Sequence, residues 1–329
     1  MTPLAIAAVL VGTLVVFAYL VVIWWLDRYE REPFWLTMLT FVWGAFGGTS
    51  LGCVCSLPLA MAAMAFGGEA FGTAVGAVVV APLVEEFTKG LVFVLLLLTR
   101  HLDNETDGLI YGAAAGLGFA AVENVMYAIA VSGEGTAAVV GLVFMRTLFS
   151  AIVHCIGSAL LGMTIGYACH RSGAARWLLW PSIGFALAVA NHALWNGLAI
   201  ATEFEVLGEA SPLLVVLGML VVAVAAAAMF GLTQFSLHRE HLVIRRHLAA
   251  EAGRGVLPLE HAAIIPYWSR RRRRDWLPPQ VPHEAYVRAA TLLAFRHHQL
   301  EVAGGERRER YLQEIALLRT EVMRLLGRS

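Results

Sequence analysis

Seven side chains capable of chemistry are spread over four otherwise apolar stretches of the sequence. They are Glu85, Glu86, Lys89, Glu123, His154, His192 and Asn196. An ionisable group in the middle of a bilayer is costly unless it is paired or hydrated, so such groups mark functional sites by default. Their spacing favours a shared site, because Lys89 follows Glu86 by three residues and shares a helix face with it. His192 and Asn196 are four residues apart and share a face in the same way.

The two adjacent carboxylates of the first stretch are expected to do different things. Side chains of consecutive residues point about 100° apart on a helix. Either Glu85 or Glu86 can therefore pair with Lys89, while the other faces a cavity. Arg146, which precedes His154 by eight residues, could neutralise the chamber or snorkel outward, and a structural role is favoured.

Carboxylates and imidazoles in one buried chamber are compatible with two forms of peptide-bond hydrolysis. In the first, Glu123, His154 and His192 bind Zn²⁺, which keeps an open position for water while another carboxylate acts as general base. In the second, no metal takes part; a buried glutamate activates water, and His and Asn side chains stabilise the oxyanion. The zincin pattern H-E-x-x-H does not occur in the chain, so the residues leave both mechanisms open.

The composition requires elements that cross a membrane. Of the 329 residues, 59% are hydrophobic and 15% are charged, and the mean hydropathy is +0.69. Soluble domains contain about 45–50% apolar and about 25% charged residues, which excludes a soluble enzyme of ordinary composition. The four cysteines have no paired C-x-x-C spacing, so neither a disulfide framework nor a cysteine zinc site is expected.

Seven apolar segments are long enough to span a bilayer, which takes roughly 20 residues. They are residues 4–26, 34–57, 71–99, 108–131, 136–169, 177–201 and 212–236. We therefore expect an all-α polytopic membrane protein with about seven transmembrane helices in a domain over 1–236. A basic tail follows over 237–329, in which the apolar spacing predicts amphipathic helices.

Arginines in the connections predict the orientation of the chain through the positive-inside rule. Every second connection contains arginine, namely 27–33, 100–107 and 170–176, whereas the others contain neither Lys nor Arg. The N-terminus is therefore expected outside and the tail in the cytoplasm. Counted at about 1.5 Å per residue from the cytoplasmic ends, the four polar stretches reach one level, roughly 21–24 Å into a core about 30 Å thick. This depth predicts one chamber in the outer half of the membrane.

Taken together, the polar motifs resemble those of the PrsW family of intramembrane proteases, relatives of the type II CAAX prenyl endopeptidases. The family's E-E-x-x-K motif is similar to residues 85–89, its F-x-x-x-E to 119–123, and its final H-x-x-x-[DN] to 192–196. The resemblance covers about residues 10–235. Three motifs in order on three separate spans are more specific than any one of them alone.

The resemblance implies roles for particular residues. Glu85, Glu86, Glu123 and His192 are implied to be catalytic or metal-ligating, with His154 as a second histidine. It also implies an intramembrane endopeptidase of the bacterial inner (plasma) membrane. Its substrate would be a single-pass membrane protein, such as an anti-sigma factor in envelope stress signalling.

Two other functions remain compatible with buried Glu, His and Lys side chains. One is a proton- or cation-coupled transporter, although such transporters often contain inverted repeats and no convincing repeat is found here. The other is a catalytically silent membrane protein that binds and protects a partner. In the tail, the arginine run 270–274 would allow binding to anionic lipid. It lacks the interleaved aromatics of a nucleic-acid site, so no nucleic-acid partner is expected.

Overall fold

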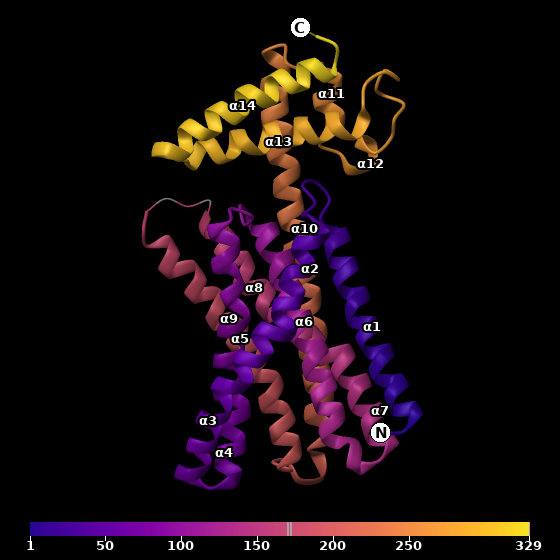
Figure 1. Ribbon diagram of the computed structural model, residues 1–329, viewed down its shortest axis with the longest axis vertical. Helices are drawn as coiled ribbons and strands as arrows, with labels where there is room; N and C mark the ends of the chain where they lie inside the picture. The colour runs from indigo at the N-terminus through magenta and orange to yellow at the C-terminus, as the bar shows by residue number, and fades with distance from the viewer. Residues whose placement is uncertain (170, 172, 329) are drawn as a thin grey trace. The chain divides into compact units, whose positions relative to one another are not determined.

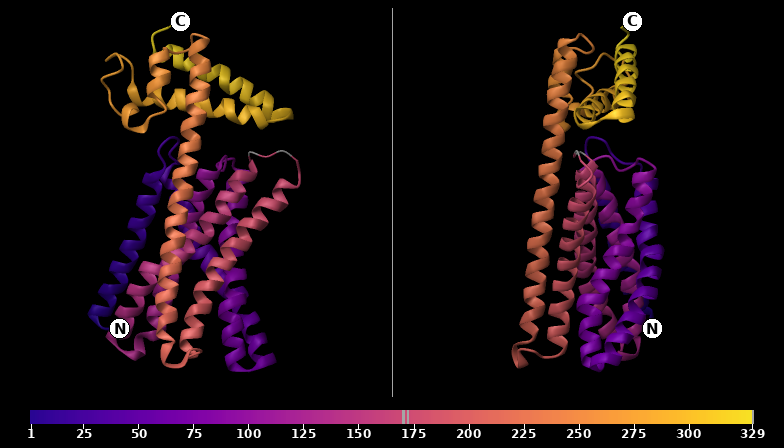
Figure 2. Two further views of the ribbon diagram at one scale, coloured as in Figure 1. Left: turned by 180° about the vertical axis from the view of Figure 1, so that it is seen from behind. Right: turned by 90° about the vertical axis from the view of Figure 1, so that its left-hand side faces the viewer.

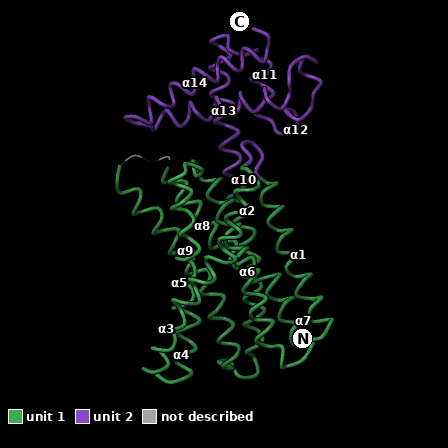
Figure 3. The backbone as a smooth tube through the Cα atoms, viewed as in Figure 1, with its two compact units in different colours: residues 1–26, 32–169, 173–232 green, residues 27–31, 170–172, 233–329 purple. Residues whose placement is uncertain are grey.

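The protein is built from helices alone in the part of the chain that the computed structural model describes, residues 1–169, 171 and 173–328. The all-α prediction is therefore confirmed. Residues 170 and 172 of the predicted loop 170–176, and residue 329 of the tail, lie outside the described residues. The chain divides into two compact units (Figures 1 and 3). Unit 1 holds most of the chain up to Leu232, and unit 2 holds the chain from Thr233 together with Asp27–Arg31.

Unit 1 is a bundle of long apolar helices (Figures 1 and 2). The α-helices are α1 (Pro3–Leu26), α2 (Phe34–Val42), α3 (Thr49–Gly67), α4 (Glu69–Val75), α5 (Ala81–Leu98), α6 (Glu105–Ala130), α7 (Thr136–Met145), α8 (Ala151–Cys169), α9 (Arg176–Glu203) and α10 (Pro212–Gly253). Two 3₁₀ turns, η3 (Val131–Glu134) and η5 (Gly208–Ala210), lie in the connections. The second half of α10 belongs to unit 2.

Six helical stretches among the described residues are long and apolar enough to cross a membrane. They are Pro3–Leu26, Phe34–Gly67, Glu105–Glu134, Thr136–Cys169, Arg176–Glu203 and Gly208–Gly253. They correspond to six of the seven predicted spans. The remaining predicted span, 71–99, is helical from Glu69 to Leu98 but is not among the six. Its helix α5 contains three charged residues, Glu85, Glu86 and Lys89, which make this segment less apolar than the other six.

Small residues on α6 allow this helix to form the centre of unit 1. Nearly every side chain from Thr106 to Ala121 is buried. A Cβ atom added to Gly112 would lie 2.1 Å from the carbonyl oxygen of Ser158, and one on Gly116 would lie 2.2 Å from that of His154. These glycines therefore permit the close packing of α6 on α8, as small residues do in membrane helix pairs.

Three π-helical turns interrupt the helices of unit 1. They are η1 (Trp43–Gly48), η2 (Gly76–Val80) and η4 (Arg146–Ser150). η2 leads into α5, which carries Glu85, and η4 leads into α8, which carries His154. The widened turn of η2 also accommodates Pro82, whose ring would otherwise clash with a carbonyl one turn back. π turns occur frequently at functional sites.

Unit 2 has a hydrophobic core of its own. The second half of α10 packs with α11 (Leu259–Ile264), α12 (Trp268–Arg271), α13 (His283–Val302) and α14 (Gly305–Leu325). Ile244 and Leu248 of α10, with Tyr286 and Leu293 of α13, are completely buried in this core. Ile315 is one of the residues through which α14 joins it. The tail is thus a folded helical unit, and the predicted amphipathic helices supply its buried face.

A buried carboxylate links the helices of unit 2, beyond the apolar stretch of α10. The Glu251 side chain is inaccessible to solvent and accepts hydrogen bonds from Arg319 at 2.6 and 2.7 Å. Arg254 donates at 2.7 Å, and His297 Nε2 lies at 3.0 Å. Burial alone would raise the pKa of Glu251, but the hydrogen bonds from Arg319 and His297 hold that pKa at about 2.

The arginine run 270–274 does not face outward as a whole. Arg271 is buried and donates to the backbone carbonyls of Arg28 and Tyr29 at 3.3 and 3.2 Å. Its guanidinium lies 5.1 Å from the centre of the Tyr29 ring. Arg271 therefore anchors the loop 27–31 within unit 2, and only its neighbours are exposed for contact with anionic lipid.

Candidate active site

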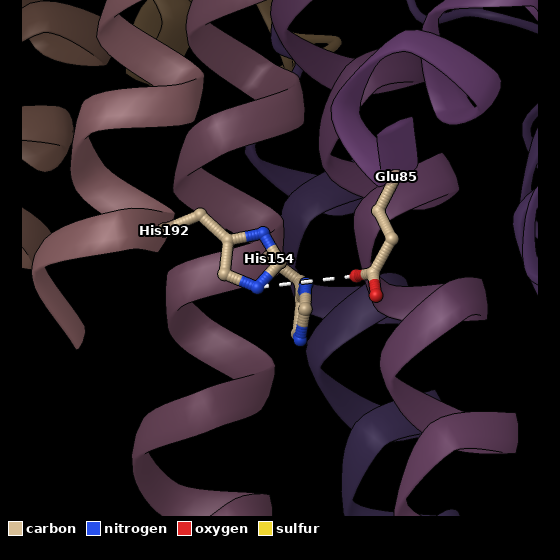
Figure 4. Close-up of side chains that lie close together, drawn as sticks. All are labelled: Glu85, His154 and His192. Atoms are coloured by element: carbon tan, nitrogen blue, oxygen red, sulfur yellow. Dashed lines mark ion pairs between the residues drawn. The ribbon is translucent and has the colours of Figure 1, made fainter. Parts of the chain in front are cut away.

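Polar side chains from four helices meet in the interior of unit 1. Glu85, Glu86 and Lys89 come from α5, Glu123 from α6, His154 from α8 and His192 from α9. Figure 4 shows Glu85, His154 and His192 directed toward one another. Six of the seven predicted site residues thus come together.

Glu86 and Lys89 form the fully buried centre of this cluster. Lys89 Nζ donates to Glu86 Oε1 at 2.7 Å, and neither side chain is exposed. The other carboxylate oxygen of Glu86 accepts from Ser158 Oγ at 3.3 Å. Lys89 also lies 4.1 Å above the Phe119 ring, where the face of the ring attracts a cation. The sequence thus correctly predicted that one of the two adjacent glutamates pairs with Lys89.

The hydrogen bond to Glu86 fixes the orientation of His192. His192 Nδ1 lies 3.0 Å from Glu86 Oε1. Because an ionised carboxylate only accepts hydrogen bonds, Nδ1 carries the proton and Nε2 keeps its lone pair. That Nε2 faces Glu85 Oε2 at 3.9 Å. A histidine whose second nitrogen is held by a carboxylate is the usual arrangement of a metal ligand.

His154 is held between a cation and a carboxylate. Lys89 Nζ lies 2.9 Å from His154 Nδ1, and His154 Nε2 lies 2.7 Å from Glu123 Oε2. Since an ammonium can only donate, Nδ1 accepts, and the proton of a neutral imidazole is on Nε2, facing Glu123. His154 would therefore bind a metal through Nε2 only after this proton moved.

Arg146 belongs to the site, in contrast to its interpretation as a structural residue. Its Nη2 lies 2.7 Å from Glu123 Oε2, and its Nε donates to Asn124 Oδ1 at 3.0 Å. The guanidinium also stacks 3.8 Å from the centre of the Tyr127 ring. Arg146 neutralises the charge of Glu123, and its position at the start of the π turn η4 directs it inward. The signal in the sequence was a lone arginine within an apolar span.

Asn196 is the predicted site residue that the structure does not bring into the cluster. Its Nδ2 donates to the backbone carbonyl of Ala77 in η2 at 2.9 Å. In the same way, Asn191 donates to the carbonyl of Val153 at 3.0 Å. Both amides attach α9 to neighbouring helices, so Asn196 positions the elements around the site and does not contact its carboxylates or imidazoles through this bond.

Three side chains of the cluster offer a suitable set of metal ligands. One ligand atom each from Glu85, His154 and His192 lies within 4.8 Å of the other two. Glu85 Oε2 is buried and has no hydrogen-bond partner in the described part of the chain, as expected of an atom that awaits a ligand. Two imidazoles and one carboxylate are a common set for catalytic zinc. This set contains Glu85 where the sequence suggested Glu123, because Arg146 and His154 already engage the Glu123 carboxylate.

The chain was compared with known proteins. It matches the model of the PrsW family intramembrane metalloprotease over residues 32–229, more than half of its length. Protease PrsW of Geobacillus kaustophilus is 29% identical over 178 residues, which cover 54% of this chain and 72% of that protein. Protease PrsW of Bacillus subtilis is 28% identical over 175 residues, 52% of this chain and 72% of the relative. The corresponding protein of Oceanobacillus iheyensis is 27% identical over 168 residues, with coverages of 50% and 70%. No solved structure matches the chain.

Proposed function

The chain belongs to the PrsW family of intramembrane metalloproteases, and from this premise we propose that the cluster around Glu86 is its active site. The protein is a membrane-embedded peptidase that acts on a protein substrate, so transport and silent binding are not favoured. One observation carries the assignment of the site. Carboxylates and imidazoles from four helices converge in the apolar bundle, and Glu86 and His192 meet although they are 106 residues apart in sequence.

Each residue of the cluster has a distinct proposed role in hydrolysis. Glu85, whose Oε2 has no hydrogen-bond partner among the described residues, binds the metal or takes the proton of the attacking water. Zn²⁺ held by Glu85, His154 and His192 would polarise the scissile carbonyl and acidify a bound water. Glu86 keeps the proton of His192 on Nδ1 and so leaves its Nε2 lone pair free on the side of Glu85.

Glu123 and Lys89 control the proton of His154. His154 Nε2 and Arg146 Nη2 each lie 2.7 Å from Glu123 Oε2, so the guanidinium favours the ionised carboxylate. Glu123 would take the Nε2 proton if His154 held a metal. In each turnover the leaving amine receives a proton that comes from the attacking water by way of a glutamate of the cluster. Lys89 offsets the buried charge of Glu86 throughout.

We further infer the substrate and the topology. The substrate is a single-pass membrane protein, of the class of membrane-anchored anti-sigma factors, in the inner (plasma) membrane of a bacterium. The tail lies in the cytoplasm, as the arginines of alternate connections favour. The chamber then lies in the outer half of the membrane, and the cut falls near the outer end of the substrate helix.

A comparison of protein N-termini in membranes tests this function without presupposing a substrate. Membranes from cells that make the wild type are compared with those that make Glu86→Gln or Glu85→Gln. Glu85→Gln guards against loss of folding, because it replaces a carboxylate outside the buried ion pair. Glu69→Gln, an exposed glutamate at the start of α4, is the matched control.

We expect new N-termini near the outer ends of single-pass helices with the wild type and with Glu69→Gln, and none with the two site variants. Cleavage that persists in both site variants would remove this cluster from catalysis. New N-termini at the cytoplasmic ends of substrate helices would contradict the proposed depth of the chamber.

A further inference from the structure

A second group of possible metal ligands lies in unit 2 and contains none of the residues used above for hydrolysis. It consists of His247 on α10 and of His298 and Glu301 on α13, with one ligand atom of each within 4.8 Å of the others. His247 Nε2 lies 3.8 Å from Glu301 Oε1, and His298 Nδ1 lies 3.5 Å from Glu301 Oε2.

These two distances end at different oxygens of Glu301, and both are longer than a good hydrogen bond between nitrogen and oxygen, which is about 2.7–3.2 Å. Two atoms bound tetrahedrally to one zinc ion at about 2.1 Å are roughly 3.4 Å apart. A zinc ion would therefore require the three ligand atoms, now within 4.8 Å of one another, to close toward that separation.

The helices hold the three side chains in place before any ion arrives. His298 and Glu301 are three residues apart on α13 and share a face of the helix. His247 lies between Ile244 and Leu248, both fully buried in the core of unit 2. Its ring also stacks on that of His297, with the centroids 5.6 Å apart and the planes inclined by 9°. The ligands are thus fixed by the same contacts that fold the unit.

His247 itself points to a missing ligand. The residue is only 9% exposed, and its Nε2 has no hydrogen-bond partner among the described residues. A buried polar atom without a partner is costly, so native structures rarely contain one without a reason.

His247 and Glu301 line a pocket of about 350 Å³ together with three arginines, which would oppose a cation. Arg254 is already paired with Glu251 at 2.7 Å. Arg246 lies 3.0 Å from Glu301 Oε1, but its side chain is 71% exposed, so this pair contributes little and is readily exchanged. Arg308 is exposed and is free to turn into solvent. Coordination by two imidazoles and a carboxylate is strong enough to displace these weak surface interactions.

We propose that His247, His298 and Glu301 form a zinc site in unit 2, with ligands distinct from those of the active site. The bound ion would join α13 to α10, the helix that continues into unit 1. This inference does not depend on the proposed function, because none of its ligands belongs to the cluster around Glu86.

Zinc content of the full-length protein in detergent tests the site. The protein is stripped with a chelator and dialysed against dilute zinc chloride, and bound zinc is measured by elemental analysis. His298→Ala and Glu301→Gln each change a partly exposed side chain, so folding is retained, which helix content by circular dichroism checks. Glu309→Gln, an exposed glutamate on α14, is the matched control.

We expect His298→Ala and Glu301→Gln to bind one equivalent of zinc fewer than the wild type, and Glu309→Gln to match the wild type. His192→Ala reports on the active site separately and should leave the equivalent in unit 2 in place. Folded His298→Ala and Glu301→Gln proteins with the zinc content of the wild type would overturn the proposal.

Discussion

Replacement of Lys89 by methionine tests whether the ion pair at the centre of the site is as thoroughly desolvated as the structure indicates. Lys89 Nζ and Glu86 Oε1 are 2.7 Å apart, and both side chains are inaccessible to solvent. Methionine fills a similar volume but leaves the Glu86 carboxylate buried without its cation. Breaking a buried pair in this way costs about 3–5 kcal/mol of folding free energy.

The second half of the test removes both charges. Glu86→Gln alone leaves the Lys89 ammonium without its carboxylate. It should also cost about 3–5 kcal/mol of folding free energy. The double variant contains no uncompensated charge at this pair, and the introduced glutamine can keep hydrogen bonds to Ser158 and His192. We therefore expect the double variant to lose less unfolding free energy than the two single variants lose together, by at least about 2 kcal/mol.

The free energy of unfolding is measured by denaturant titration in detergent for all four proteins of the cycle. Lys89 is the only lysine of the chain, so an amine-reactive reagent gives a second readout. It should modify Lys89 only in the unfolded wild type. Peptidase activity should be absent in the double variant although it folds, which separates catalysis from stability. If the losses of the two single variants add up to the loss of the double variant within about 0.5 kcal/mol, the two side chains are not energetically coupled and the pairing argument is refuted.

Three further perturbations probe other parts of the molecule. Arg146→Ala removes the cation that neutralises Glu123, so the cleavage rate of a membrane substrate should fall by about 10–100-fold. Arg146→Lys should recover part of this rate. A rate equal to that of the wild type would leave Arg146 with a structural role only. Gly116→Ala places a Cβ atom 2.2 Å from a backbone carbonyl of α8 and should lower the unfolding free energy by about 1–3 kcal/mol in denaturant titration; an unchanged midpoint would show that α6 and α8 can separate freely. The carboxyl of Glu251 has a pKa lowered from 4.5 to about 2, so the stability it gives unit 2, about 3 kcal/mol, is complete above pH 4.5 and is lost as the pH falls toward 2. Circular dichroism melts from pH 7 to pH 2 should show this loss in the wild type and a flatter profile in Glu251→Gln, and parallel profiles would contradict it.

The sequence was sufficient to predict the helical class and the membrane segments. Hydropathy is a sum over neighbouring residues, so it needs no knowledge of packing. Hydropathy predicted the segment 71–99 as a span as well, although Glu85, Glu86 and Lys89 interrupt its apolar run and the segment is not among the six most apolar helical stretches. These charges lower hydropathy because they serve the site, so the same residues that reveal function obscure the span.

The sequence also identified most members of the site, but it could not assign their partners. Spacing along α5 allowed Lys89 to pair with either glutamate. The choice of Glu86 depends on Ser158 and His192, which other helices bring to it. The sequence could not decide whether Arg146 neutralises the site or snorkels outward, because its contact with Glu123 joins two different helical segments.

Residue types and their spacing thus determined which side chains are too costly to bury without a purpose. The tertiary structure decided which carboxylate neutralises which cation, which nitrogen of His192 faces Glu85, and that the tail folds around a core of its own. The physical reason is that hydropathy and helix periodicity are properties of one segment. Pairing depends on how each helix is rotated against its neighbours, and this rotation is set by close packing at residues such as Gly116 and by π turns that no local pattern announced.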